Sequence, residues 1–424
     1  MTSMTNRRTF LTTAASAFAA ARVAAQDGRI KLGVIGCGGY GMTDLRAAFK
    51  AGGVECVALC DVDSDHLAKA AAEAEKLQGA TPKTYKDYRE LLDTGGLDAV
   101  IIATPPHWHA LQFIAACAKG IGVYCEKPLS YDVREGSAMV DAWRRAGNIV
   151  QIGFQRRQAA SFRAAREYIR AGHAGRIVQV DVNIHYAARL QDATPQEPPP
   201  ALDWDAWCGP GPKIPYSPSV GHHAWRLEET SGNGHLVDWG IHLIDAIRFT
   251  LGEAMPVSVT AAGGIYQFKN KITTPDTLTA HFEFAERPVV WRHRLWGAAE
   301  YDPAISNGIL FFGEKETIFA SDRRWEIIPQ GKDAEKKVLE ETGPHPGEAH
   351  MAEFLSAVRK REQPSCQPDD AWRSTATVQL GMISYKTKSR VDWDAARETI
   401  SNNEAARRLL KRPYRKPYQH PYKG

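Results

Sequence analysis

A glycine-rich turn between a predicted strand and a predicted helix constrains this chain most. An apolar, β-branched run from Ile30 to Ile35 stops at residues 36–41, which read Gly-Cys-Gly-Gly-Tyr-Gly and match the pattern G-x-G-x-x-G. In this pattern the first glycine allows a tight turn, the second leaves room for a pyrophosphate, and the third lets helix and strand pack closely. The N-terminus of the following helix points at the phosphates. The turn therefore predicts dinucleotide contacts at Gly36, Gly38, Gly39, Tyr40 and Gly41.

An aspartate stands where such a site needs an acid. The second apolar strand, residues 54–60, ends at Asp61, about twenty residues beyond the glycines, where a carboxylate meets the ribose hydroxyls. That carboxylate favours NAD because it would repel the 2′-phosphate of NADP, although a nearby Arg or Ser could offset the repulsion. The alternative interpretation is a plain glycine turn followed by an aspartate that caps a helix.

Strand-like and helix-like segments alternate from Arg29 to Gly153, which is typical of a doubly wound parallel sheet. Ligands of such a sheet bind at the carboxyl ends of its strands. Asp61, Thr104 and the pair Glu126-Lys127 all follow predicted strands. The sequence thus predicts that these side chains share one edge of the sheet.

The remainder of the chain has a different order of predicted helices and strands. A proline-rich crossing at residues 194–218 and a helix at 236–251 precede several consecutive strand-like runs, which favour an α+β domain with a mainly antiparallel open sheet. We predict a Rossmann domain at residues 28–153 and a substrate-binding and oligomerisation domain at 154–424. Helices near residues 350–361 and 369–386 are expected to pack back across the junction. The basic, aromatic tail at residues 411–418 is interpreted as a solvated or oligomer-facing arm.

The N-terminus predicts export. Residues 6–11, Asn-Arg-Arg-Thr-Phe-Leu, carry a twin-arginine pattern, and an alanine-rich segment with a small-residue exit at 23–25 follows. Residues 1–25 are therefore expected to be a Tat signal read by the Tat machinery, with a periplasmic or exported product; a disordered basic tail is the alternative. Tat substrates cross the membrane folded, often with a cofactor.

Composition excludes several classes of partner. The 424 residues are 43% hydrophobic and 24% charged, and a net charge of +4 is too small to indicate nucleic acid. The seven cysteines contain no C-x-x-C and are interpreted as small buried hydrophobic residues. His107-x-His109 and His222-His223 lack a carboxylate or cysteine at ligand spacing, so no metal site is predicted.

Two elements carry candidate chemistry. Lys127 lies between a strand and a proline, and burial beside a positively charged nicotinamide would favour its neutral amine, which suits proton transfer. Asp238 and His242 are four residues apart and share one face of a predicted helix. A surface turn for Lys127 and a structural pair for Asp238 and His242 are the alternatives.

These motifs together resemble the Gfo/Idh/MocA oxidoreductase family. The pattern runs from the glycine turn and Asp61 through Ala103-Thr-Pro105 with His109, Glu126-Lys127-Pro128 and Gly153-Phe-Gln-Arg-Arg157 to Asp238-x-Gly240-x-His242-x-x-Asp245. The resemblance implies catalysis by Lys127, Asp238 and His242, and sugars, cyclitols or their derivatives as substrates. It also implies a homodimer or homotetramer built on the second domain's sheet. Further cofactor contacts are expected at Thr104, Pro105, His109, Glu126 and Lys127, and substrate contacts at Arg157, Tyr186, Trp225, Arg226, Asp238 and His242.

The implied reaction moves a hydride between a sugar carbon and a nicotinamide. His242 or Lys127 would take the hydroxyl proton, while Asp238 would orient His242 and the substrate. Because free dinucleotide is scarce outside the cytoplasm, we expect a tightly bound NAD, with NADP open. The alternatives are an NAD-dependent glycosidase that oxidises a ring carbon transiently, and a sugar sensor with a vestigial Rossmann domain.

Overall fold

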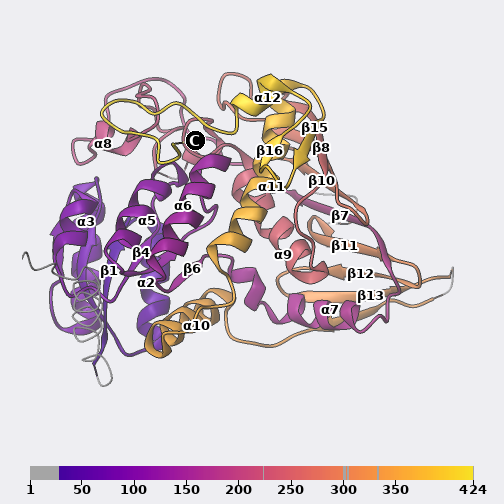
Figure 1. The fold of residues 1–424 in the computed structure, drawn as a ribbon, viewed down its shortest axis with the longest axis horizontal. Coiled ribbons are helices and arrows are strands. Elements are labelled where there is room, and N and C mark those ends of the chain that lie inside the picture. The colour runs from indigo at the N-terminus through magenta and orange to yellow at the C-terminus, as the bar shows by residue number, and fades with distance from the viewer. Residues whose placement is uncertain (1–27, 223, 299–301, 303–304, 332–333, 424) are drawn as a thin grey trace, which may run out of the picture.

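The computed structural model describes residues 28–222, 224–298, 302, 305–331 and 334–423, and Figure 1 shows its fold. The predicted export signal at residues 1–25 lies outside the described residues. No helix within the described ranges is long and apolar enough to cross a membrane.

The first half of the chain forms a six-stranded parallel sheet with the order β3-β2-β1-β4-β5-β6. Every residue of β4 and β5 is buried, as expected for strands covered on both faces. The strands are β1 (Ile30–Ile35), β2 (Val54–Cys60), β3 (Lys83–Tyr85), β4 (Ala99–Ile102), β5 (Gly122–Cys125) and β6 (Val150–Ile152). The helices are α2 (Gly39–Ala51), α3 (Ser64–Gln78), α4 (Tyr88–Asp93), α5 (His109–Ala118) and α6 (Val133–Ala146), with a 3-10 turn η1 (Pro106–Trp108).

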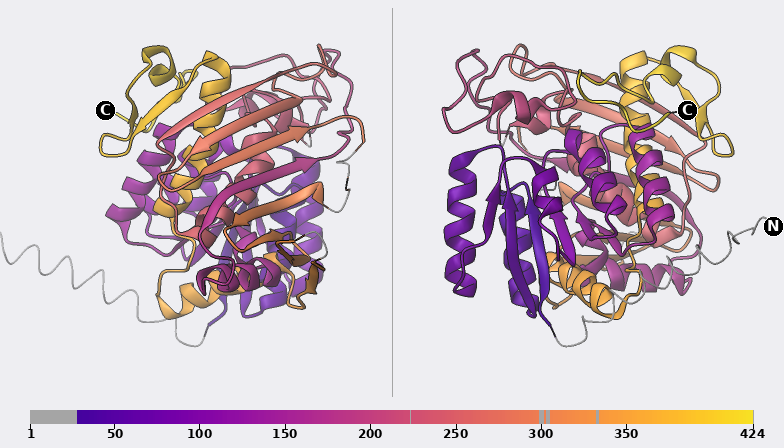
Figure 2. Two further views of the ribbon diagram at one scale, coloured as in Figure 1. Left: turned by 90° about the vertical axis from the view of Figure 1, so that its right-hand side faces the viewer. Right: turned by 60° about the vertical axis from the view of Figure 1, so that its left-hand side comes forward.

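The second half forms a ten-stranded sheet with the order β14-β13-β12-β11-β7-β10-β9-β8-β15-β16. Neighbouring described strands pair antiparallel, except β7 with β10. Its strands lie on one side of the molecule with the helices behind them (Figure 2). They are β7 (Ile177–His185), β8 (Ser258–Gly264), β9 (Thr277–Glu283), β10 (Pro288–Arg294), β11 (Asn307–Gly313), β12 (Glu316–Ala320), β13 (Arg324–Pro329), β14 (Lys337–Glu340), β15 (Val391–Asp394) and β16 (Thr399–Ile400). Both sheets confirm the predicted fold class.

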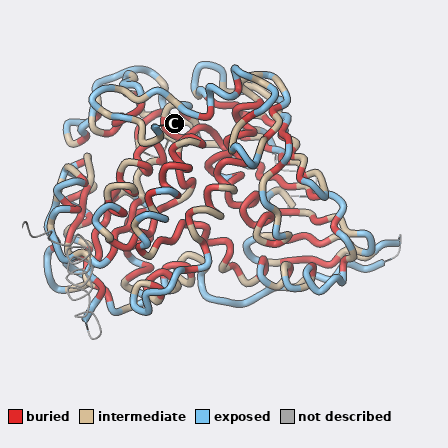
Figure 3. Tube along the Cα trace, viewed as in Figure 1, coloured by how far each residue is buried: buried red, intermediate tan, exposed pale blue. Residues whose placement is uncertain are grey.

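Helices of the second half cover this sheet and reach the first half. They are α7 (Ala160–Arg170), α8 (Trp204–Cys208), α9 (Ile241–Leu251), α10 (Pro346–Lys360), α11 (Pro368–Thr387) and α12 (Glu404–Arg408), with 3-10 turns η2 (Gln155–Gln158) and η3 (Trp225–Leu227) and a π-helical turn η4 (Leu236–Gly240). Helix α11 packs against α6 on one side and against α9 and β8 on the other, while α10 packs on α2. These contacts confirm that both helices cross the junction. One buried cluster runs through both sheets and α11, and a second lies on the other face of the first sheet against α2, α3 and α10. Figure 3 shows the buried residues along the chain.

The basic tail packs against the rest of the chain, so its interpretation as a solvated arm is wrong for Arg412, Arg415 and Tyr418, whereas an oligomer-facing role stays a prediction. The Arg412 side chain is 10% exposed and its Nε lies 2.9 Å from a carboxylate oxygen of Glu135. Arg415 pairs with Asp205 at 2.8 Å, and the Tyr418 ring meets Trp108 edge to face. Arg412 and Arg415, whose charges favoured an exposed segment in the sequence analysis, are therefore paired with carboxylates of the same chain. All seven cysteines are free and buried, which confirms their interpretation.

Candidate active site

The glycine turn forms one wall of a cavity of about 340 Å³. Gly36 has φ +90°, and a Cβ there would lie 2.7 Å from the Thr104 backbone nitrogen, so this position requires glycine. Gly38 precedes α2, and no side chain caps the N-terminus of that helix. Its N–H groups therefore face the cavity as an anion site suited to a pyrophosphate. The residues fit a dinucleotide, and the predicted contacts that line the cavity are Gly36, Gly38, Gly39, Tyr40, Asp61, Thr104 and Pro105.

Asp61 shapes the ribose end of this cavity. One carboxylate oxygen accepts the Cys37 N–H at 2.7 Å, and the other accepts the Asp63 N–H at 2.9 Å. Burial raises the pKa of Asp61, and the two N–H donors act in the opposite direction. These bonds fix the carboxylate at the carboxyl end of β2, and its contact with a ribose stays a prediction.

His109 connects two loops at the strand ends. Its ring is 1% exposed, with Nδ1 2.8 Å from the Pro128 carbonyl oxygen and Nε2 2.7 Å from that of Thr104. Burial lowers the pKa of His109. In this position the imidazole holds the loops after β4 and β5 together, whereas Thr104 and Pro105 themselves line the cavity.

Glu126 is a buried carboxyl group at the end of β5. Its Oε1 accepts a hydrogen bond from Gln155 Nε2 at 2.5 Å, and its Oε2 accepts the Lys127 N–H at 3.2 Å. Burial raises the pKa of Glu126 to about 7, and Lys127 opposes that shift. A Cβ on Gly153 would lie 2.3 Å from Glu126, which explains the glycine at the start of the Gly-Phe-Gln-Arg-Arg motif.

Lys127, Asp238 and Arg226 meet in one ion-paired cluster. Lys127 Nζ donates to the Asp238 backbone oxygen at 2.7 Å and lies 3.0 Å from Asp238 Oδ1. Arg226 Nε lies 3.1 Å from Asp238 Oδ2, and its guanidinium stacks 4.5 Å from the centre of the Trp225 ring. The Asp238 side chain is 3% exposed. The fold thus joins residues 111 positions apart in sequence, and Trp225 and Arg226 also line the cavity.

His242 lies in α9 with a neutral ring. Burial lowers its pKa well below the usual value, and Lys127 and Arg156 lower it further. Its Nδ1 is buried and has no hydrogen-bond partner among the described residues. Asp238 lies in the preceding π-helical turn η4, where its Oδ1 binds Lys127 and its Oδ2 binds Arg226. Asp238 therefore orients the lysine, and the expectation that it orients His242 is not met.

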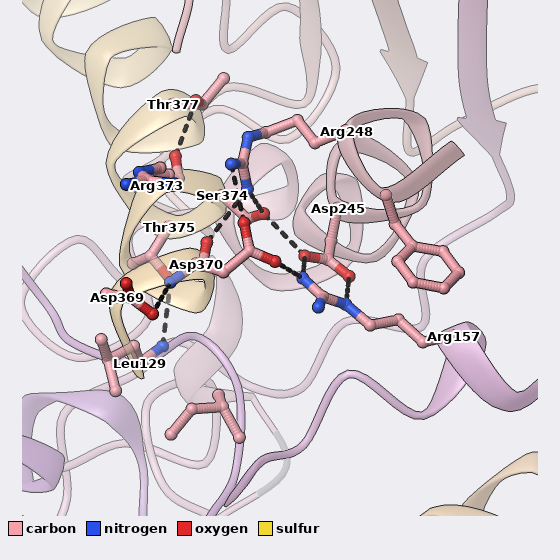
Figure 4. Close-up of polar contacts among 12 residues, drawn as sticks. Leu129, Arg157, Asp245, Arg248, Asp369, Asp370, Arg373, Ser374, Thr375 and Thr377 are labelled. Carbon is pink, nitrogen blue, oxygen red and sulfur yellow. Dashed lines mark hydrogen bonds and ion pairs between the residues drawn. The ribbon is translucent and has the colours of Figure 1, made fainter. Parts of the chain in front are cut away.

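Arg157 belongs to the core and does not reach the site, contrary to the sequence prediction. Its side chain is 2% exposed and binds Asp245 in a bidentate pair at 2.5 and 2.7 Å. It also pairs with Asp370 of α11 at 2.7 Å, and Arg248 binds the same carboxylate at 2.9 Å (Figure 4). A buried guanidinium that already holds two carboxylates cannot bind a sugar. Asp245, the last residue of the Asp-x-Gly-x-His-x-x-Asp motif, therefore stabilises the core by pairing with Arg157.

Arg156, not Arg157, extends toward the site. Its guanidinium lies 5.9 Å from the centre of the Trp239 ring and pairs with Asp322 at 2.7 Å, and its charge acts on His242. The sequence could not choose between adjacent arginines because the choice depends on the register of the 3-10 turn η2.

His235 was missed by the sequence analysis although it lies three residues before Asp238. It is 1% exposed, and its ring lies 5.1 Å from that of Tyr186. Tyr186 is itself influenced by Asp238, since burial and that carboxylate raise the pKa of its hydroxyl to about 12. The i, i+3 spacing of His235 and Asp238 on a helical segment is the signal that could have found it.

A parallel sheet with a glycine turn, an acid after β2 and a lysine–carboxylate cluster at the strand ends define a dinucleotide-dependent oxidoreductase. Residues 30–154 match the oxidoreductase family with an NAD-binding Rossmann fold, and residues 180–420 match its C-terminal alpha/beta domain. The chain therefore belongs to the Gfo/Idh/MocA oxidoreductase family.

Named relatives include carbohydrate enzymes. The rhizopine catabolism protein MocA of Rhizobium meliloti is 28% identical over 225 residues, covering 53% of this chain and 58% of the relative. Levoglucosan dehydrogenase of Pseudarthrobacter phenanthrenivorans is 32% identical over 189 residues, covering 44% and 41%. The chain thus matches about half the length of these relatives.

Solved structures share the fold over nearly their whole length. A levoglucosan dehydrogenase in complex with NADH and levoglucosan superposes with a TM-score of 0.68 at 19% identity, covering 86% of this chain and 99% of the other. The WlbA dehydrogenase from Bordetella pertussis, in complex with NADH and UDP-GlcNAcA, gives 0.65 at 21% identity and the same coverage.

Proposed function

We propose that this protein is an NAD-dependent dehydrogenase that oxidises a hydroxyl carbon of a sugar, a cyclitol or a derivative of either. The cluster of Lys127, Asp238 and Arg226 beside the glycine-lined cavity carries this proposal. The relative levoglucosan dehydrogenase is named for a compound of this class, and an indole beside charged hydrogen-bond donors suits a polyhydroxylated ring.

The bound dinucleotide supplies a nicotinamide ring that accepts or returns a hydride. This chain's residues position the substrate and move its hydroxyl proton. Arg226 and Lys127 are held on opposite oxygens of Asp238, so both present N–H donors in fixed directions. Donors fixed in this way stabilise the negative charge that develops on the substrate oxygen.

We assign the role of base to His242, because its ring is buried and its Nδ1 has no hydrogen-bond partner among the described residues. A neutral imidazole keeps a lone pair that can accept the hydroxyl proton, whereas Lys127 Nζ already contacts the backbone oxygen and the carboxylate of Asp238. Uptake of a hydride by a bound nicotinamide would remove one positive charge from the site, which would lower the cost of protonating His242. The proton therefore leaves the hydroxyl oxygen for His242 while Lys127 remains a donor.

We further propose that the protein is exported by the Tat machinery with NAD already bound. The twin-arginine motif at residues 6–11 supports export. Retention of NAD is supported by the residues that cover the cavity. Trp207 from α8 and Tyr418 from the tail line it together with the glycine turn. The open sheet of the second half supports assembly into a homodimer or homotetramer, and NADP stays possible until the ribose contact of Asp61 is tested.

The test uses the mature protein as purified, without added cofactor. We would mix it with a panel of aldoses, cyclitols and aryl glycosides and record reduced-nicotinamide absorbance together with aglycone release. A band that rises with one sugar class and falls when a second carbonyl compound is added supports the proposal. Aglycone release without a lasting band would show a glycosidase instead. No band with any substrate, even after NAD or NADP is added, would overturn the proposed reaction.

A further inference from the structure

A cluster of Asp63, His66 and His222 lies at the rim of the dinucleotide cavity, away from the lysine cluster. One ligating atom from each residue lies within 4.8 Å of those of the other two. His66 and His222 both line the cavity, and their rings lie 4.3 Å apart. Two imidazoles and one carboxylate are a donor set that Zn²⁺ and similar divalent ions prefer.

The carboxylate of this cluster is already oriented. Asp63 Oδ1 accepts the N–H groups of Asp65 and His66 at 2.8 and 3.1 Å and so caps α3. That cap leaves Oδ2 directed at His222, whose Nε2 lies 2.9 Å away. Partners that fix a carboxylate in this manner are typical of metal sites.

His222 holds an unusual backbone conformation. Its φ is +23°, a region that non-glycine residues seldom occupy and that is found preferentially at functional sites. In this conformation the imidazole meets two side chains from the start of α3. His222 belongs to the longer segment at residues 187–235, which contains the predicted proline-rich crossing at 194–218 and is named the crossing segment. The cluster therefore joins the two halves of the molecule at the edge of the cofactor cavity.

A second cluster of similar composition is not proposed as a metal site. Asp132, Glu135 and His420 also place ligating atoms within 4.8 Å of one another. The Arg412 N–H lies 3.0 Å from Asp132 Oδ2 and its Nε lies 2.9 Å from Glu135 Oε1. This arginine supplies the positive charge that a metal ion would bring, and no described cation occupies the equivalent position in the first cluster.

We infer that Asp63, His66 and His222 bind one divalent transition-metal ion, with Zn²⁺ as the expected type, and that the ion fastens the crossing segment over the bound dinucleotide. Tetrahedral bonds of about 2.0 Å place ligand atoms about 3.3 Å apart, so small side-chain rotations suffice. Coordination replaces the proton between His222 Nε2 and Asp63 Oδ2, which moves to Nδ1 or to solvent. Water completes the coordination.

The experiment uses the mature, untagged holoprotein after treatment with a chelator. Zn²⁺ binding is measured by titration calorimetry, and Co²⁺ absorption reports the coordination geometry. We expect one Zn²⁺ per chain and a loss of affinity of about 100-fold in both His66→Ala and His222→Ala. His173→Ala is the matched control, because this exposed histidine packs on Tyr168 outside the cluster.

Release of the resident dinucleotide gives a second readout. Zn²⁺ should slow release by about tenfold in the unaltered protein and in His173→Ala, and should have no effect in His222→Ala. Unchanged Zn²⁺ affinity in His66→Ala would overturn the inference, since the Asp63–His222 hydrogen bond alone would then explain the geometry. Should either alanine variant fail to fold, His66→Gln, which keeps a polar side chain at this half-buried position, must show the same loss of Zn²⁺ affinity.

Discussion

Replacing Asp238 by Asn tests whether this carboxylate organises the active site. The substitution keeps the shape of the side chain and removes its charge from between two cations. Lys127 and Arg226 lie 3.0 and 3.1 Å from its oxygens. At an effective dielectric constant of about 20, each contact corresponds to about 5 kcal/mol of Coulomb attraction.

Most of that attraction offsets the cost of burying the charges, so the measurable effect is smaller. Removing one partner of a buried ion pair typically costs about 3–5 kcal/mol. The Lys127 side chain is 11% exposed and that of Arg226 is 34% exposed, so the lysine accounts for most of the loss. We expect Asp238→Asn to lower the free energy of unfolding by about 3 kcal/mol and kcat by about 100-fold or more.

Asp245→Asn is the matched control for this experiment. Asp245 is equally buried and pairs with Arg157 at 2.5 Å, yet it lies in the core network and not at the site. Urea unfolding should show a similar loss of stability in both variants, whereas single-turnover hydride transfer should slow only in Asp238→Asn. A parallel loss of kcat in both, or no loss in Asp238→Asn, would refute the role assigned to Asp238.

Three further outcomes follow from the structure. Arg157→Lys should lower the free energy of unfolding by about 3 kcal/mol, because a lysine cannot make the bidentate pair; a raised KM in a variant of unchanged stability would restore the substrate role predicted for Arg157. The protein should lose stability as the pH falls below 6.5, because burial lowers the pKa of His293 and of His350 from 6.5 to about 4. Above pH 6.5 both states leave these rings neutral; below it only the unfolded chain takes up the protons, at a cost of about 2 kcal/mol per ring at pH 5. Equal unfolding midpoints at pH 7 and pH 5 would contradict this. Tyr418→Ala should speed release of the bound dinucleotide without changing kcat, as fluorescence of the reduced cofactor can show, and unchanged release would show that the tail does not cover the cavity.

Local chemistry made the first sheet predictable. Strands β1, β2, β4 and β5 are short and mainly apolar runs, and the glycine at position 36 is required by a φ of +90°, so pattern and structure agree there. Strand β3 reads Lys-Thr-Tyr and gives no such signal. The order of the second sheet was not predictable, because β7 pairs with β10 and β11, which lie more than a hundred residues away. Such pairing depends on which faces pack and not on any local signal.

The site was predictable as a set of residues but not as a geometry. Four-residue spacing suggested that Asp238 would bind His242, yet η4 is a π-helical turn, which changes the direction of side chains along the helix. Tertiary packing decides which of Arg156 and Arg157 reaches the site. It also brings Asp63 to His222, although the two residues are 159 positions apart in the sequence. Sequence spacing therefore missed the candidate metal cluster.

Backbone hydrogen bonds also join the two halves at the loop after β2, where the adenosine end of a dinucleotide belongs. The Ser64 N–H donates to the Ala201 carbonyl oxygen at 2.9 Å, and the Asp203 N–H donates to that of Val62 at 3.0 Å. Arg415 then ties the tail to Asp205 of α8. Each of the two backbone hydrogen bonds contributes about 1 kcal/mol, and about 1.4 kcal/mol corresponds to a factor of ten. If this cover must open before the cofactor leaves, the two bonds would slow release by about 30-fold. The proposal that the protein is exported with NAD bound requires slow release of this kind, and it further requires that a second carbonyl substrate reoxidise the cofactor in place.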